Sequence, residues 1–177
     1  MSAMIDKLVW EGRLYLVQPR IRLLRSFDER SHSYLGYVLG VQGALAGEST
    51  EFQVAIGKAA HAKHKFRYGD FVRGASHPVP DNRLETADYY KTSGLKLVER
   101  TNAGTSEPPP WVGVPPDLEV YRERGHRRLH ANIYAGKCLA CIWGCRMPVE
   151  IIVDHWKPDI KRYRFETFCY GPFLCGY

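Results

Sequence analysis

The sequence lacks any long apolar run. Its apolar stretches, such as Val149–Val153 with one Glu inside it, fall far short of the ~20 residues that span a bilayer. The first residues, MSAMIDKLVWEGR, have no basic start followed by an apolar core, which a secretory signal would need. We therefore expect a protein without membrane spans, located in the cytoplasm or associated with the nucleoid.

Compositional bias is weak as well. The chain has 177 residues, of which 45% are hydrophobic and 25% are charged, which is typical of an ordered globular protein. Lys and Arg together number 25 and Asp and Glu number 19, so the formal net charge is +6. This length suits one large domain or two small ones, and the moderate positive charge favours an anionic partner.

Sequence motifs of common enzymes are also missing. There is no GxxxxGK[ST], GxGxxG, HExxH or GxSxG. His61 and His64 could share a helix face, but no carboxylate follows at a metal-binding distance. Asp154 and His155 are neighbours on an expected strand, so their side chains would point to opposite faces. We therefore expect a protein without catalytic activity.

Cysteine is absent from residues 1–137, and all five cysteines lie in the last 40 residues. Between these parts, residues 102–117 carry five prolines, which exclude a helix or a central strand and favour a partly stiff linker. The sequence thus predicts three segments: a first module over residues 1–101, a Pro-rich linker over 102–117 and a second module over 118–177.

The first module has the alternating pattern of β-strands. Leu8, Trp10, Leu14 and Leu16 occupy even positions, and after Pro19 the apolar set moves to odd positions. This shift predicts a bent, bulged first strand. Further strands are expected over 34–42, 51–57, 71–75 and 94–101, with a helix over 58–66.

This order of elements resembles the OB-fold, a five-stranded Greek-key barrel. The resemblance covers roughly residues 7–101. It depends on Gly12 in the bent first strand, Gly36 and Gly40 in the second, the helix after the third and the Gly69-Asp70 turn before the fourth. The expected fold is mainly β: an OB-like barrel with one helix, followed by a small C-terminal β module.

The second module contains two cysteine pairs. Cys138 and Cys141 form a Cys-x2-Cys pair, and Cys169 and Cys175 form a Cys-x5-Cys pair. Two strands, 147–156 and 162–168, are expected between them. Paired cysteines at both ends of a β-hairpin resemble a zinc ribbon, although the second spacer departs from the usual two residues. So small a module usually needs a metal or disulfides to fold.

We therefore expect one structural zinc ion on Cys138, Cys141, Cys169 and Cys175, because four thiolates close the coordination shell. Cys145 is then either a buried thiol or a replacement for one of the four. Four thiolates and one divalent ion sum to −2, which lowers the net charge from +6 to about +4. Removing the metal should unfold residues 118–177. One alternative is that the cysteines are simply buried core residues. A redox function of Cys138 and Cys141 is a second alternative, which the sequence favours less.

Basic residues cluster in three places, with tyrosines nearby, as single-stranded nucleic acid requires. The expected nucleic-acid contacts are Arg20, Arg22, Tyr34, Tyr37, Lys58, Lys63, Arg67, Arg122, Arg127 and Arg128. The resemblance to OB-folds adds Gln53 and the segment 83–91. If six cations neutralise phosphates, the slope of log affinity against log salt should be roughly −4 to −5. Alternatively, each of these residues is an ordinary surface side chain that contacts solvent and no ligand.

The predicted function is thus binding of single-stranded or structured nucleic acid. The alternative is an accessory or adaptor subunit that uses the same modules for contacts with protein partners. Proteins of acyl-CoA metabolism that pair a rubredoxin-like zinc ribbon with an OB-fold have a similar inventory. In those proteins the ribbon precedes the barrel, and the reversed order here counts against that function.

Overall fold

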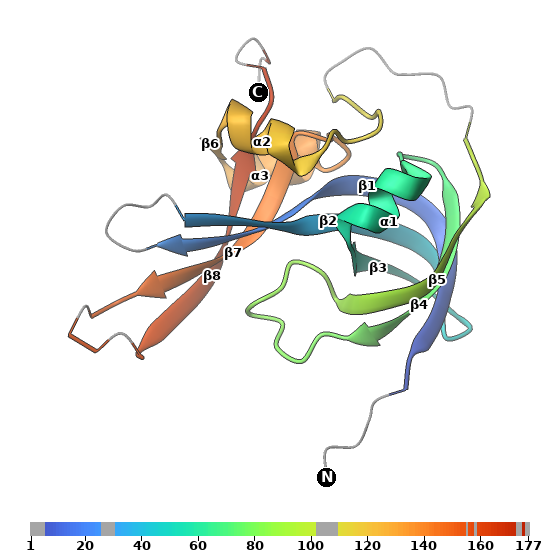
Figure 1. Ribbon diagram of the computed structural model, residues 1–177, viewed down its shortest axis with the longest axis horizontal. Coiled ribbons are helices and arrows are strands. Elements are labelled where there is room, and N and C mark those ends of the chain that lie inside the picture. Colours follow the sequence, from blue (N-terminus) through green and yellow to red (C-terminus); the bar gives the residue numbers. More distant parts are fainter. Residues whose placement is uncertain are drawn as a thin grey trace.

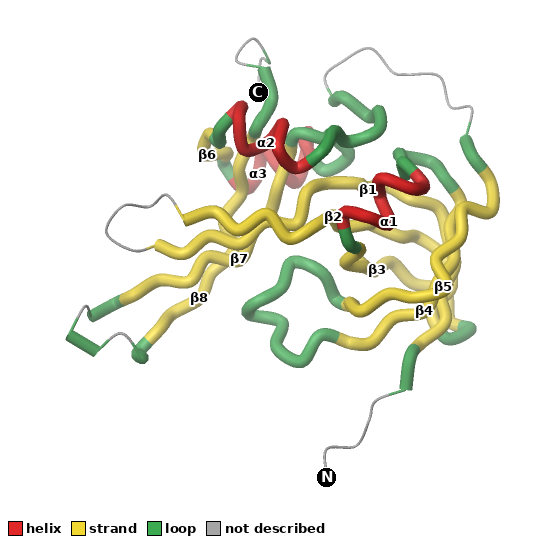
Figure 2. Tube along the Cα trace, in the orientation of Figure 1, coloured by secondary structure: helices red, strands yellow, loops and turns green. Residues whose placement is uncertain are grey.

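The computed structural model describes residues 6–25, 31–101, 110–154, 156–157, 159–172 and 175. The fold is mainly β, as predicted: within these residues, eight strands form one mixed sheet with short helices packed at its side (Figures 1 and 2). The first five strands are β1 (Leu8–Arg25), β2 (Ser31–Leu45), β3 (Glu48–Ile56), β4 (Phe71–Pro78) and β5 (Tyr89–Glu99).

These five strands close on themselves. They lie in the order β2-β3-β5-β4-β1, and β1 also pairs with β2. Four of the five pairings are antiparallel, whereas β3 and β5 are parallel and meet only at Val54 and Tyr89. The helix α1 (Lys58–His64) connects β3 to β4. The ring is therefore weakest between β3 and β5.

The predicted bend of the first strand is present. The pairing register of β1 with β2 shifts between Leu14 and Leu16 and again between Arg20 and Ile21, on either side of Pro19. A shift by one residue exchanges the faces of a strand, which explains why the apolar positions change from even to odd. β5 begins at Tyr89, earlier than the predicted Gly94.

The C-terminal part adds a hairpin and several short helical segments. The hairpin consists of β7 (Gly144–Ile152) and β8 (Lys161–Cys169), and β6 (Arg127–Leu129) extends it. Before and between them lie α2 (Leu118–Arg124), α3 (Ala131–Ile133) and the π-helical turn η1 (Tyr134–Cys138). The sequence did not predict these helical segments, because each is too short to show a helical period.

One core joins the two parts of the chain. Trp10 and Ile21 of the barrel belong to the same buried cluster as Tyr121, Met147 and Phe168. β7 also pairs in parallel with the end of β1, at Leu23–Arg25. No helix in the described part of the chain is long and apolar enough to cross a membrane.

The predicted linker contacts both parts where it is described. The Pro116 carbonyl accepts a hydrogen bond from the Tyr37 hydroxyl at 2.6 Å, and the Pro115 carbonyl accepts one from His61 Nε2 at 3.0 Å. The carbonyl of Trp111 accepts from the backbone of Ile142 at 2.9 Å. Residues 102–109 of the predicted linker lie outside the described residues.

Candidate functional site

The hairpin brings the two cysteine pairs to the same end of the molecule. Cys138 ends η1, and Cys141 lies in the turn before β7. Cys169 is the last residue of β8 and pairs with Gly144, the first residue of β7. Because β7 and β8 are antiparallel, the first residue of β7 and the last residue of β8 lie at the same end of the hairpin. Cys175 follows β8 at that end.

The four predicted ligands line one small cavity. Cys138, Cys141, Cys169 and Cys175 share its wall with Trp111, Trp143 and Gly171 among others. Its volume is about 10 Å³, about the space of a single water molecule or ion. All four thiols are free of disulfides, and the first two are buried. The arrangement suits one bound ion rather than an organic cofactor.

The four thiols lie close enough for their charges to interact. Burial raises the pKa of Cys138 to about 11, and the negative charges of Cys141, Cys169 and Cys175 push its pKa in the same direction. Four thiolates this close would repel one another unless a cation lay between them. Within the described residues, however, no three His, Cys, Asp or Glu side chains already form a group arranged to hold a metal ion.

Backbone groups around the cavity point at sulfur. The N–H of Gly171 donates to Cys169 Sγ at 3.2 Å. Burial raises the pKa of Cys141, and hydrogen bonds from the backbone of Trp143, Trp111 and Gly144 act in the opposite direction. Such donors favour the thiolate that binds a metal. A Cβ at Gly171 would lie 3.1 Å from Trp143 Cβ, which leaves little room for a side chain beside the sulfur.

Arg127 supports the second cysteine pair. Its Nη2 lies 3.5 Å from Cys169 Sγ and donates to the carbonyls of Gly171 at 3.1 Å and Pro172 at 3.0 Å. The guanidinium therefore places a positive charge beside the cysteines, where a four-thiolate zinc centre would carry −2. The sequence suggested Arg127 as a nucleic-acid contact and gave no signal of this position.

Gln18 supports the first pair from the barrel. This buried side chain of β1 donates from Nε2 to the carbonyls of Cys138 at 3.0 Å, Leu139 at 3.1 Å and Cys141 at 2.8 Å. Its Oε1 accepts from the Tyr134 hydroxyl at 2.7 Å. Sequence reasoning missed Gln18, since a single Gln in a strand has no distinctive pattern.

Cys145 lies apart from the four. It is fully buried in the common core, and its Sγ donates to the Pro19 carbonyl at 3.4 Å. Burial raises its pKa far above the usual value. Of the two predictions for this residue, its surroundings favour the buried thiol.

Most of the predicted nucleic-acid contacts already have partners within the chain. Arg20 and Arg22 bind Glu85, Arg67 binds Asp70 and the Thr101 carbonyl, and Arg128 binds Glu166. Tyr37 is 1% exposed, which leaves no surface for a base. Tyr34 is partly buried and lies beneath the Arg122 guanidinium, 4.9 Å from its ring centroid. Lys58 and Lys63 are exposed on α1.

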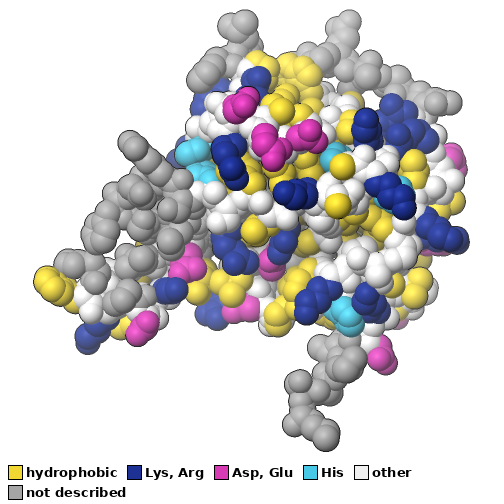
Figure 3. Space-filling model, viewed as in Figure 1, with side chains coloured by type: hydrophobic (Ala, Val, Ile, Leu, Met, Phe, Trp, Pro, Cys, Tyr) yellow, Lys and Arg dark blue, Asp and Glu magenta, His cyan; other side chains and the backbone are white. Residues whose placement is uncertain are grey.

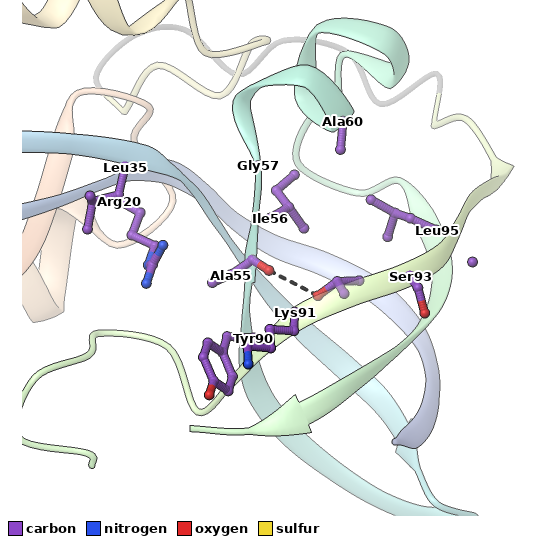
Figure 4. Close-up of a pocket in the computed structure, with 12 residues that line it drawn as sticks. Arg20, Leu35, Ala55, Ile56, Gly57, Ala60, Tyr90, Lys91, Ser93 and Leu95 are labelled. Carbon is purple, nitrogen blue, oxygen red and sulfur yellow. Dashed lines mark hydrogen bonds between the residues drawn. The ribbon is translucent and has the colours of Figure 1, made fainter. Parts of the chain in front are cut away.

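A second, larger cavity opens where β3 and β5 separate (Figure 4). It has a volume of about 440 Å³, within the range of small-ligand sites. The labelled side chains come from β1, β2, β3, α1 and β5, and a hydrogen bond of 3.0 Å from Thr92 to the Ala55 carbonyl crosses the gap. The weak β3–β5 pairing leaves this space open.

The β5 wall of the cavity carries an aromatic ring and a cation. The Lys91 ammonium lies 5.2 Å from the ring centroid of Tyr90, and Arg20 also lines the cavity. Lys91 has a φ of 51°, in the left-handed region that non-glycine residues rarely adopt. Such backbone conformations concentrate at functional sites. Tyr90 and Lys91 both belong to the segment 83–91 that the OB-fold resemblance suggested.

Charge on the surface is mixed. On the face in Figure 3, the Lys and Arg side chains are separated by acidic and uncharged ones rather than forming one continuous patch. A polyanion would therefore meet discrete cationic points.

Comparisons with protein-family models, with curated proteins and with solved structures each find no match for this chain.

Proposed function

We propose that the protein binds single-stranded nucleic acid without catalysing a reaction, and that one structural zinc ion organises its C-terminal part. The observation that carries the binding proposal is the cavity between β3 and β5, whose wall includes the ring of Tyr90 with the ammonium of Lys91 over it. Bases stack on rings and phosphates attract ammonium groups, so this pair matches the chemistry of a nucleotide strand.

The strand order supports the OB-fold resemblance on which the proposal draws. An OB-fold is a five-stranded, partly open Greek-key barrel. The ring of β1 to β5, the helix α1 between β3 and β4 and the opening between β3 and β5 agree with that description. The exposed Lys58 and Lys63 of α1 lie on the element whose Gly57–Ala60 end lines the cavity.

The electrostatic contribution should be smaller than the full set of basic residues implies. Arg20, Arg22, Arg67, Arg127 and Arg128 are committed to internal partners, as described above. Lys91 lines the cavity, and Lys58 and Lys63 are exposed on α1, the helix whose first residues line it. With three phosphate contacts, the slope of log affinity against log salt should be roughly −2 to −3.

Fluorescence anisotropy with a labelled oligothymidylate tests the binding proposal. We expect Lys91→Glu to weaken binding and to make the salt slope shallower by about one contact. Lys96→Glu is the matched control, because Lys96 is exposed on the same strand outside this cavity. Equal losses for both variants, or no binding by the unaltered protein, would refute the cavity as the site. Binding of a protein partner instead would support an adaptor function.

Zinc is the metal that four thiolates best suit. The residues present fit it: four free thiols line a cavity of single-ion size, backbone N–H groups donate to sulfur, and Arg127 offsets negative charge. The ion would be structural, because four protein ligands leave no position for water or substrate.

Metal analysis of protein purified under reducing conditions tests the zinc proposal. We expect about one zinc per chain, lost when Cys138 or Cys169 is changed to Ser. Cys145→Ser is the matched control, since Cys145 faces Pro19 rather than the cavity and should leave the zinc content unchanged. Clean protein that contains no metal would contradict the proposal.

A further inference from the structure

The tip of the β7–β8 hairpin exposes an unusual amount of apolar surface within its described residues, 153–154, 156–157 and 159–162. Trp156 is 82% exposed, Ile160 is 53% exposed and Val153 is 50% exposed. Single exposed apolar residues are common, but several large ones on one projecting element indicate a contact surface. In Figure 1 this hairpin projects away from the barrel, and Figure 3 shows hydrophobic, basic and acidic side chains together at its end.

The tip also carries exposed cations. Lys157 and Arg162 are exposed at the tip, and Lys161 lies 2.6 Å from Glu150. The Asp154 carboxylate accepts a hydrogen bond from the backbone of Trp156 at 2.9 Å. Asp159 is also exposed. The tip therefore combines a flat ring with two exposed cations, Lys157 and Arg162, and it also carries the acidic residues Asp154 and Asp159.

The hairpin connects to the cavity through the loop between β4 and β5. The Arg83 guanidinium of this loop lies 5.3 Å from the ring centroid of Tyr163 on β8. Two residues further along the same loop, Glu85 binds Arg20, which lines the cavity. This loop thus links the cavity to the hairpin through two arginines, of which Arg83 also pairs with Asp81 and Arg20 pairs with Glu85. A strand of several nucleotides could follow this route.

We propose that the projecting hairpin is a second contact for single-stranded nucleic acid, in which a base stacks on Trp156 and phosphates contact Lys157 and Arg162. This inference rests on the proposed function and extends it to an element outside the barrel. An indole offers the largest stacking surface of any side chain, and stacking tolerates any base. The hairpin thereby lengthens the site beyond what the cavity alone covers.

Trp156→Ala tests the proposal in the full chain. With an oligothymidylate of about 20 nucleotides, longer than the ~4–16 that one OB barrel covers, we expect affinity to fall at least about 5-fold. Trp156→Phe should retain most of the affinity because it keeps a ring. A base-free polyanion of the same length should bind Trp156→Ala and the unaltered protein equally, since stacking needs bases. Because Trp156 is exposed, thermal unfolding should be unchanged.

Ile160→Ala is the matched control, because it removes exposed apolar surface at the same tip without removing a ring. An equal loss for Ile160→Ala and Trp156→Ala would overturn stacking. Unchanged oligonucleotide binding by Trp156→Ala, with the unaltered protein binding, would refute the hairpin but leave the cavity intact. Binding to phosphatidylcholine–phosphatidylserine vesicles that requires Trp156, with oligonucleotide binding unaffected, would assign the tip to membranes and overturn the inference. If no form binds oligonucleotides, the proposed function itself fails.

Discussion

His32 on β2 illustrates how a single side chain can link the two parts of the molecule. Its ring lies 4.0 Å from the ring of His126 and its Nδ1 lies 3.2 Å from the Tyr170 hydroxyl. Its Nε2 is buried without a hydrogen-bond partner. Burial, with the nearby His126, lowers the pKa of His32 to about 4. The folded state therefore favours the neutral ring.

Acid should destabilise the protein through this residue. The unfolded His has a pKa of about 6.5, so between pH ~6.5 and ~4 the unfolded chain binds more protons than the folded chain. The free energy of unfolding should fall across that range, and His32→Asn should make the fall shallower. Burial also lowers the pKa of His61 and of His126, so some pH dependence will remain.

Urea denaturation at pH 7 and pH 5 measures this effect as a difference between the two proteins. Comparison with unaltered protein also removes any shared contribution from protonated cysteines. A parallel loss of stability in both proteins on acidification would show that His32 does not titrate in this way.

At the scale of elements, side-chain hydrogen bonds from Gln18 join β1 to the turn that carries the first cysteine pair. The Gln18 amide of β1 shares its two N–H hydrogens among three backbone carbonyls of the C-terminal part, and its oxygen accepts from the Tyr134 hydroxyl. Buried carbonyls that lose their donors are costly, at about 1–3 kcal/mol for each unsatisfied group. The Gln18 contacts therefore fix where the cysteine turn lies relative to the barrel.

We expect Gln18→Leu to reduce the free energy of unfolding by about 2 kcal/mol or more, because it leaves these groups unsatisfied. It should also weaken zinc retention against a chelator, since the turn that carries Cys138 and Cys141 loses its support. Gln42→Leu is the control, as Gln42 is exposed on β2 and should change stability by less than about 0.5 kcal/mol. Chemical denaturation with metal analysis measures both effects, and equal stability of the two variants would contradict this role.

At the scale of the whole molecule, the two parts share structure rather than only a connecting segment. β1 pairs with β2 and β4 in the barrel and with β7 in the C-terminal hairpin. Tyr121 and Met147 lie in one buried cluster with Trp10. Loss of a metal ion from the cysteines should therefore lower the stability of the barrel as well.

Metal removal should then destabilise more than residues 118–177. With a chelator present, we expect one cooperative unfolding transition at a lower temperature, in which amides of β1 and β4 lose protection together with those of β7. Hydrogen exchange resolved by peptide measures this outcome. Loss of protection confined to residues 118–177, with an unchanged barrel, would instead support an autonomous C-terminal module.

Local pattern was sufficient for much of the fold. The period-2 alternation of Leu14 and Leu16, the register change at Pro19 and the helix-forming run after Gly57 each reflect short-range geometry, and the strands and helix they predicted are present. Cysteine spacing likewise identified the four thiols that line one cavity, because spacing and chain reversal alone bring such pairs together. Metal binding itself stays a prediction.

Tertiary structure alone decided which polar residues are available. Arg20 and Arg127 have the sequence character of surface cations, yet Glu85 and the Cys169 turn engage them from distant parts of the chain. Tyr37 is buried whereas Trp156 is exposed, although both are aromatic residues on or beside strands. A strand pattern cannot show which distant segment covers a face, and long-range packing determines both the ion-pair partners and the exposed rings.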